Sequence, residues 1–239
     1  MKTIKNQLSH LRLHGMYQSW MAMTETRQHH KLSLKEGLEV LLQAEKEDRI
    51  NRRFERLKKT AKFRYQSSIE ELQLDASRGI NTSLITELTK GTYLSKGESI
   101  LITGATGCGK SFLASALGHQ ACSQGKKVLY FNIQKLLMQT KMARLDGSFL
   151  KLFDKIAKTD LLILDDFGLA HLEQSQQMDL MEIIEDRHGK YSTIIASQLP
   201  VGSWYEIIGE ATIADAILDR LVHTSYRIEL KGESLRKKL

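Results

Sequence analysis

The feature that most constrains this chain is the octapeptide Gly104-Ala105-Thr106-Gly107-Cys108-Gly109-Lys110-Ser111. It follows a β-rich apolar run, residues 99–103, and it precedes a segment with helical periodicity. Glycines let such a loop wrap tightly with its N–H groups pointing inward, and a helix N-terminus adds a positive field. This strand–loop–helix context is the one that a phosphate-binding P-loop requires. The motif therefore predicts a nucleoside triphosphate site, and a glycine-rich turn with an incidental lysine is the less favoured interpretation.

The two residues that close the motif have separate expected roles. In P-loop proteins the lysine reaches the β- and γ-phosphates, and the hydroxyl after it binds Mg²⁺. These roles fall on Lys110 and Ser111. We therefore expect ATP and Mg²⁺ as cofactors, with ATP held by Gly104, Ala105, Thr106, Gly107, Cys108, Gly109, Lys110, Ser111 and Phe112.

A pair of carboxylates follows a second apolar run. Residues 161–164 read as a buried strand, and Asp165-Asp166 come directly after them. The carboxyl edge of an open parallel sheet is where ligands bind. We predict that Asp165 holds the magnesium ion together with Ser111, and that Asp166 orients or deprotonates the attacking water. An acid pair at a strand end also occurs as a solvated turn, but the P-loop upstream favours the catalytic role.

A third polar element follows the apolar run of residues 193–196. If this strand lies between the P-loop strand and the strand of residues 161–164, a polar side chain after it would contact the γ-phosphate or the water. Gln198 is the first candidate and Ser197 the second. A polar strand end before Pro200 with no catalytic role is the alternative.

The elements around these motifs predict an α/β fold. The expected strands are residues 99–103, 127–131, 161–164, 193–196 and 226–230, and amphipathic segments separate them at 133–144, 149–157 and 178–187. Strand–helix alternation favours right-handed crossovers and a parallel sheet flanked by helices. Strands that are apolar throughout fit a sheet buried on both faces.

The chain before residue 76 has a different pattern, which predicts a small all-α domain. Ser33 and Glu36 have capping-box spacing, and the leucine-rich periodicity after them indicates one long helix or two consecutive ones. We therefore expect a helical N-terminal domain over residues 1–75 and an ATPase domain over residues 76–239.

Positive charge gathers in the N-terminal region. The chain has a formal charge of +7, and residues 1–75 hold 15 of its 35 Lys and Arg residues. Between Arg49 and Arg64 a single acid, Glu55, stands among eight basic residues. On a helix, the face opposite Ile50, Phe54, Leu57 and Ala61 would be basic, as suits a DNA backbone; the first candidates for DNA contact are Arg52, Arg53 and Arg56. A solvated surface helix is the alternative.

Other classes of protein are disfavoured. Two cysteines do not suit a disulfide framework, and the scattered histidines do not suit a zinc site. The N-terminus lacks the apolar core of a secretory signal, and no apolar run approaches the roughly 18 residues that span a bilayer. We expect a cytoplasmic protein that does not enter a membrane.

The motifs, taken together, resemble those of a known family. GATGCGKS, LLILDDFG, TIIASQLP, AILDRL and the closing GESLR occur in this order. The order is similar to that of the IstB-like AAA+ ATPases, which are transposition helpers encoded by bacterial insertion sequences. It is less closely similar to the DnaC-type loaders of replicative helicases. The likeness covers nearly the whole chain, and the combination of LLILDDFG with SQLP and the closing GESLR is far more specific than the P-loop.

The resemblance implies a P-loop NTPase fold of the AAA+ ASCE type and a DNA-dependent activity. Family members assemble on DNA with ATP bound, and they recruit or regulate a transposase. An arginine finger that acts on a neighbouring subunit falls on Arg220, with a surface arginine paired to Asp219 or Asp215 as the alternative. A second candidate set for contact with duplex DNA comprises Lys135, Lys141 and Arg144, in a region that related initiator-type ATPases turn toward DNA.

The chain departs from the wider AAA+ pattern in two places. Asp166 stands where the usual residue is glutamate, which suggests slow turnover. Only nine residues follow Leu230, so we expect no C-terminal lid domain, and Arg236 is the sole candidate for a second sensor arginine.

Three alternatives to a transposition ATPase stay open. One is a helicase loader, which would bind a replicative helicase. Another is a small-molecule kinase, which would need an acceptor pocket and a lid. The third is a DNA-binding scaffold with an inert nucleotide site, against which Lys110, Ser111 and Asp165 count.

Overall fold

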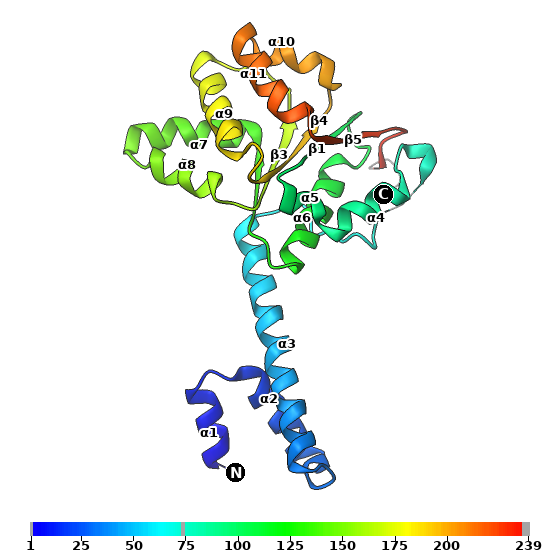
Figure 1. Cartoon of the computed structure of the whole chain (residues 1–239), viewed down its shortest axis with the longest axis vertical. Helices are drawn as coiled ribbons and strands as arrows, with labels where there is room; N and C mark the ends of the chain where they lie inside the picture. Colours follow the sequence, from blue (N-terminus) through cyan, green and yellow to red (C-terminus); the bar gives the residue numbers. More distant parts are fainter. Residues whose placement is uncertain (1, 73–74, 236–239) are drawn as a thin grey trace. The chain divides into compact units, whose positions relative to one another are not determined.

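A computed structural model describes residues 2–72 and 75–235 of the chain. The chain divides into two compact units, Met1–Arg56 and Leu57–Leu239. Figure 1 shows the helices and strands with their labels. The division falls inside a helix and earlier in the chain than the expected boundary between residues 75 and 76.

The first unit is helical. It contains α1 (Lys2–His10), α2 (His14–Glu25), a short 3₁₀ turn (Gln28–His30) and most of α3 (Leu34–Ala61). The capping box at the start of α3 is present, since the Ser33 N–H donates to Glu36 at 2.8 Å and the Glu36 N–H donates to Ser33 Oγ at 3.3 Å. Of the two expectations for this region, the single long helix is confirmed.

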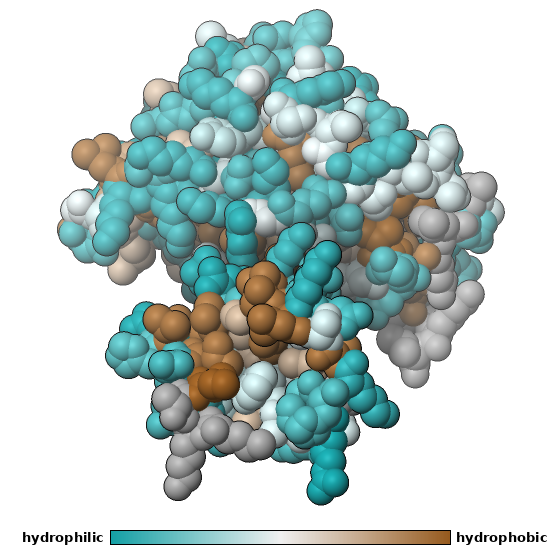
Figure 2. Space-filling view, turned by 60° about the horizontal axis from the view of Figure 1, so that its bottom comes forward, coloured by the Kyte–Doolittle hydropathy of each residue, from teal (hydrophilic) through white to brown (hydrophobic). Residues whose placement is uncertain are grey.

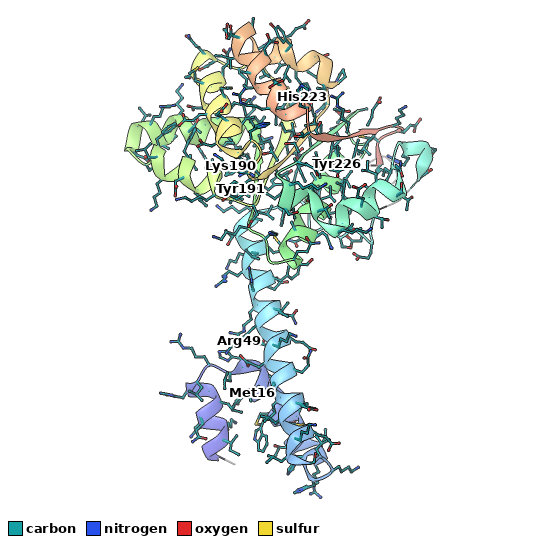
Figure 3. The ribbon with its side chains drawn as sticks, viewed as in Figure 1. Met16, Arg49, Lys190, Tyr191, His223 and Tyr226 are labelled. Carbon is teal, nitrogen blue, oxygen red and sulfur yellow. The ribbon has the colours of Figure 1, made fainter. Side chains whose placement is uncertain are left out.

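A close approach holds α2 against α3. A Cβ atom on Gly15 would lie 2.3 Å from the Ala44 carbonyl oxygen, so only glycine fits there. The buried Glu45 accepts hydrogen bonds from the N–H groups of Gly15 and Met16 at 2.8 and 3.2 Å and pairs with Arg49 at 2.7 Å; Figure 3 labels Met16 and Arg49. Burial raises the pKa of Glu45, but the hydrogen bonds from Arg49, Met16 and Gly15 lower it by more, so the pKa lies below its usual value.

The apolar face of α3 differs from its expected packing. Ala61 is buried, but Ile50 is 51% exposed. Leu34, Leu38 and Leu42 are exposed as well. Figure 2 shows that apolar side chains are exposed on the face of the molecule drawn there. Helical periodicity identifies an apolar face without identifying what covers it, and that explains the difference.

The second unit is built on a parallel sheet. Within the described residues, five strands pair in the order β2-β3-β4-β1-β5, all parallel. The strands are β1 (Ser99–Gly104), β2 (Val128–Asn132), β3 (Leu161–Phe167), β4 (Ser192–Ser197) and β5 (Ser225–Leu230). The expected parallel sheet is confirmed, and β4 lies between the P-loop strand β1 and β3.

Helices cover both faces of this sheet (Figure 1). One face packs on α7, α8, α9, α10 and α11 through a core that includes Leu101, Leu162 and Ile195. Neighbouring strand residues such as Ile100 and Ile194 point to the other face and are also fully buried. The helices of this unit are α4 (Thr82–Lys90), α5 (Thr92–Lys96), α6 (Lys110–Ser123), α7 (Ile133–Asp146), α8 (Phe149–Ala157), α9 (Gln174–Arg187), α10 (Trp204–Ile208) and α11 (Ala211–Val222), with short 3₁₀ turns at Ala76–Arg78 and Val201–Ser203.

The segment after α3 packs within the second unit, which explains why the division lies where it does. The Phe63 ring meets the rings of His119 and Tyr130, with centroids 4.3 and 6.3 Å apart. Ser67 Oγ donates to the Phe112 carbonyl at 3.2 Å. Residues 63–67 therefore form part of the wall of the P-loop region.

Candidate nucleotide site

The P-loop joins β1 to α6, as the motif predicts. Gly104 and Gly107 have φ values of 145° and 82°, which side chains rarely adopt. A Cβ atom on Gly104 would also lie 2.3 Å from the Leu230 carbonyl oxygen. The loop therefore needs glycine both for its turn and for its contact with β5.

Lys110 is buried at the start of α6, and its ammonium group turns onto its own loop. Its Nζ atom donates to the carbonyl oxygens of Gly104 and Ala105, both at 2.8 Å. These bonds hold one positive charge inside the loop, where its N–H groups and the helix N-terminus already favour anions.

Asp165 lies beside the P-loop hydroxyl. Its side chain is 1% exposed, and its Oδ1 accepts a hydrogen bond from Ser111 Oγ at 3.0 Å. Its Oδ2 accepts from the Tyr130 hydroxyl and from Arg64 at 3.3 Å. Among the described residues no three His, Cys, Asp or Glu side chains gather as a metal cage. A hydroxyl and one carboxylate nevertheless suit Mg²⁺, which takes few protein ligands when it is bound with phosphates.

Asp166 is held in an unusual conformation. Its φ is 59°, and the pairing of β3 with β4 shifts register between Leu164 and Phe167, so the two acids lie in an irregular part of β3. Asp166 Oδ2 accepts from Arg64 at 2.9 Å and from the Asn132 amide at 2.8 Å. The irregular backbone directs both carboxylates toward the P-loop region, whereas regular alternation would direct them to opposite faces.

The two candidates after β4 are placed differently. Gln198 Oε1 accepts a hydrogen bond from Thr106 Oγ1 of the P-loop at 2.7 Å. Ser197 is fully buried, donates to the Phe167 carbonyl at 2.8 Å and accepts from the Leu199 N–H at 3.0 Å. Gln198 therefore faces the loop, while Ser197 braces the backbone.

These groups surround a cavity of about 180 Å³. It is lined by Arg64, Tyr65, Thr106, Gly107, Gly109, Lys110, Ser111, Phe112, Asp166, Gln198 and Leu235. The Leu235 N–H donates to the Gly107 carbonyl at 3.0 Å, which brings this residue against the loop. Arg236, the candidate second sensor, lies outside the described residues.

Sequence reasoning missed three contacts of the acid pair. Tyr130 and Asn132 lie at the end of β2, next to β3, and this adjacency was the available signal. Burial raises the pKa of the Tyr130 hydroxyl, and the bond to Asp165 raises it further, so the hydroxyl stays a donor. Burial lowers the pKa of Arg64, but the neighbouring Asp166 raises it more, and the guanidinium stays charged.

Arg220 does not line the P-loop cavity. It lies on α11, pairs with Glu185 of α9 and donates to the Ala216 carbonyl at 2.9 Å, and its side chain is 26% exposed. Its partner is thus neither Asp219 nor Asp215. It borders an open groove of about 990 Å³ beside α10 and α11.

The candidate DNA-binding residues of α3 border a shallow hollow of about 250 Å³. Its lining residues are five arginines, Arg12, Arg49, Arg52, Arg53 and Arg56. Arg52 pairs with Asp48 at 2.7 Å and with Glu45 at 3.7 Å. Arg12 lies in the turn between α1 and α2. Its place in this hollow is not predicted by the sequence, because helical periodicity relates only residues of the same helix.

The second set of basic residues is split between solvent and structure. Lys135 and Lys141 are exposed on α7. Arg144 pairs with the buried Asp179, and its guanidinium lies 3.7 Å from the Phe149 ring centroid. Its charge therefore already has a protein partner.

Cys108 and Cys122 are buried free thiols. None of the helices in the described parts of the chain is long and apolar enough to cross a membrane.

Residues 6–239 match the model of the IstB-like ATP binding protein family. The chain is 41% identical over 232 residues to a Sinorhizobium fredii protein described as an insertion sequence ATP-binding protein, covering 97% of this chain and 95% of the relative. It is 44% identical over 196 residues to the corresponding protein of insertion sequence IS1162 from Pseudomonas fluorescens, covering 82% of this chain and 85% of the relative.

A solved structure supports the same fold. The crystal structure of the DnaC helicase loader superposes with a TM-score of 0.53 at 20% identity, covering 66% of this chain and 96% of that one. The expected P-loop NTPase fold of the AAA+ type is thereby confirmed, with a parallel sheet flanked by helices. Because the family model and the Sinorhizobium fredii relative match nearly the whole length of the chain, this chain belongs to the IstB-like ATP-binding protein family.

Proposed function

We propose that this protein is a Mg²⁺-dependent ATPase that assembles on duplex DNA and recruits or regulates a transposase. The observation that carries the ATPase proposal is the contact of Ser111 with Asp165, with Asp166 beside them at the edge of the P-loop. Family membership supports ATP as the ligand.

Each residue of the site has a proposed role. Lys110 contacts the β- and γ-phosphates, while Ser111 and Asp165 hold Mg²⁺, which offsets the phosphate charge when bound. Asp166 orients or deprotonates the attacking water, and Gln198 contacts the γ-phosphate or that water. The hydrogen bond between Gln198 and Thr106 supports this last role, because it holds the amide against the loop.

Arg220 is proposed to act on a neighbouring copy of the chain. It does not line the P-loop cavity of its own chain and borders an open groove, so a phosphate that it meets belongs to another subunit. Its pairing with Glu185 must then be exchanged for the phosphate on assembly. Such a finger contributes about 10³ to 10⁵ in rate.

DNA contact is proposed for Arg52, Arg53 and Arg56 first, together with Arg12 at the same hollow. Lys135 and Lys141 form the second set, and Arg144 contributes less because Asp179 already neutralises it. Contacts of this kind are made to the phosphate backbone, so binding has weak sequence preference and strong salt dependence.

A transposase is the proposed partner because relatives that match most of this chain are described as insertion sequence proteins. A helicase-loading function is the alternative, favoured by the fold that the chain shares with the DnaC loader. Pull-down of the purified protein with the transposase encoded beside it and with the host replicative helicase separates the two.

The test of the assembled ATPase is steady-state hydrolysis over a series of protein concentrations, with and without duplex DNA. We expect DNA-stimulated turnover that rises faster than linearly with protein and falls at least about 10³-fold in Arg220→Ala. Arg227→Ala, an exposed arginine on β5, serves as the control. Turnover proportional to protein and indifferent to DNA and Arg220 would contradict the proposal.

A mixing experiment tests whether the finger acts between subunits. Lys110→Ala lacks a working nucleotide site but keeps Arg220, and Arg220→Ala has the reverse defect. If Arg220 acts on the neighbouring subunit, the mixture regains activity that neither variant has alone. A mixture no more active than the sum of its parts assigns Arg220 to its own chain.

A further inference from the structure

Arg64 has the most specific placement of any residue near the site that the proposed mechanism leaves without a role. It lies in the segment after α3, and its guanidinium bonds both carboxylates of the acid pair, at 3.3 Å to Asp165 and 2.9 Å to Asp166. Its side chain is 40% exposed, whereas that of Asp165 is 1% exposed. One cation therefore covers the two groups on which hydrolysis depends.

The same guanidinium borders the P-loop cavity. Arg64 lines it together with Lys110, Ser111 and Gln198. It also lines a second cavity of about 490 Å³, with Lys62, Lys135 and Lys155. Open space in both cavities lets its long side chain change partners without a movement of the backbone.

Charge determines which partner Arg64 takes when ATP binds. Asp165 is the proposed magnesium ligand, and a guanidinium bonded to it would lie next to a divalent cation. The guanidinium and the metal ion are both positive, so they repel each other strongly when they are adjacent. The triphosphate, in contrast, brings several negative charges into the adjacent cavity. Guanidinium groups bind phosphate oxygens through two parallel hydrogen bonds, as they do carboxylates.

We propose that Arg64 is a ligand of the γ-phosphate in its own subunit, and that it exchanges Asp165 and Asp166 for phosphate oxygens when ATP binds. This inference rests on the proposed ATPase function and adds a residue to it. The exchange frees Asp165 for the metal and Asp166 for the water. It also makes the site sensitive to the third phosphate, because ADP has no γ-oxygens to attract the guanidinium.

The test compares the binding of a fluorescent non-hydrolysable ATP analogue with that of fluorescent ADP, both with Mg²⁺. We expect Arg64→Gln to lower the ratio of ATP to ADP affinity about tenfold or more, the usual effect of one lost charge-assisted hydrogen bond. Arg64→Lys retains the positive charge but cannot form two parallel hydrogen bonds, so its ratio of ATP to ADP affinity should lie between those of the native chain and Arg64→Gln. Lys62→Gln, which borders only the second cavity, is the control and should match the native chain.

A second variant removes a confounding effect. Arg64→Gln also uncovers two carboxylates, which would repel a γ-phosphate. Arg64→Gln/Asp166→Asn, compared with Asp166→Asn alone, removes part of that repulsion. A ratio that stays low supports direct contact, while recovery to the Asp166→Asn value overturns it. Circular dichroism melting confirms that each variant is folded.

Other outcomes are equally decisive. If Arg64→Gln strengthens ATP and ADP binding by the same factor, Arg64 only obstructs the site and the proposal is wrong. If the native chain binds both nucleotides and the ratio is unchanged in Arg64→Gln, the Arg64 proposal fails and the ATPase proposal stands. If the native chain binds neither nucleotide, the ATPase proposal fails first.

Discussion

The backbone conformation at residue 166 explains why this chain has aspartate where the AAA+ pattern has glutamate. Its φ of 59° lies in the left-handed region, which Asp and Asn enter more readily than other side chains. Glutamate, the usual residue there, lacks the short side chain that makes this conformation accessible. The irregularity of β3 and the identity of residue 166 are therefore linked.

Substitutions at this position separate chemistry from conformation. Asp166→Asn should keep the fold but lower hydrolysis about 100-fold or more, because the amide cannot accept the proton of water. Asp166→Glu should instead lower the free energy of unfolding by about 1 kcal/mol through backbone strain. Denaturant melts and single-turnover hydrolysis measure the two effects. An Asp166→Glu variant as stable as the native chain would refute the link between φ and residue type.

At the scale of elements, the contact of α2 with α3 depends on one glycine. A Cβ atom on Gly15 would press on the backbone of Ala44, whereas one on Gly37, also helical, meets nothing within 4 Å. Gly15→Ala should destabilise the N-terminal unit by about 1–3 kcal/mol, as overpacking does. Gly37→Ala should stabilise it by about 0.5–1 kcal/mol through helix propensity. Trp20 fluorescence during denaturation, in a Trp204→Phe background, reports on this unit, and equal shifts in the two variants would contradict the packing argument.

The secondary-structure elements were more predictable from the sequence than the contacts that individual side chains make. Apolar runs bounded by turn residues gave the five strands to within a few residues, and the P-loop and acid pair were placed on the correct edge. Local pattern failed where a contact joins distant segments. Arg64 belongs to a basic cluster in the sequence, yet it bonds acidic residues about a hundred positions later. Arg220 likewise pairs with Glu185, on a different helix from the acids considered.

The exposed leucines of α3 also show that the sequence pattern of one helix does not reveal its contacts with other elements. Periodicity correctly identified an apolar stripe, since such spacing is what an amphipathic helix requires. Burial depends on whether another element is present to cover that stripe. Ala61 is buried within the second unit, to which it belongs, and Leu34 is 90% exposed.

At the scale of the whole molecule, charge is carried unevenly. The N-terminal unit contains the five-arginine hollow, while the second unit contains the nucleotide site. If the hollow meets the DNA backbone, Arg53→Ala and Arg56→Ala should each lower the slope of log affinity against log salt by about 1. Lys31→Ala, outside the hollow, should leave it nearly unchanged. Fluorescence anisotropy with labelled duplex DNA over a salt series measures the slopes, and slopes equal to that of the native chain would remove the hollow from the interface.

The strand order of the sheet has a consequence for synthesis on the ribosome. β1, which leads into the P-loop, is flanked by β4 and β5, both translated long after it. Until they emerge, both hydrogen-bonding edges of an apolar strand stay unpaired, a state that attracts other chains. The nascent chain therefore acquires a nucleotide site late and all at once. Any delay in translation between β1 and β4 prolongs the period in which the growing polypeptide depends on chaperones.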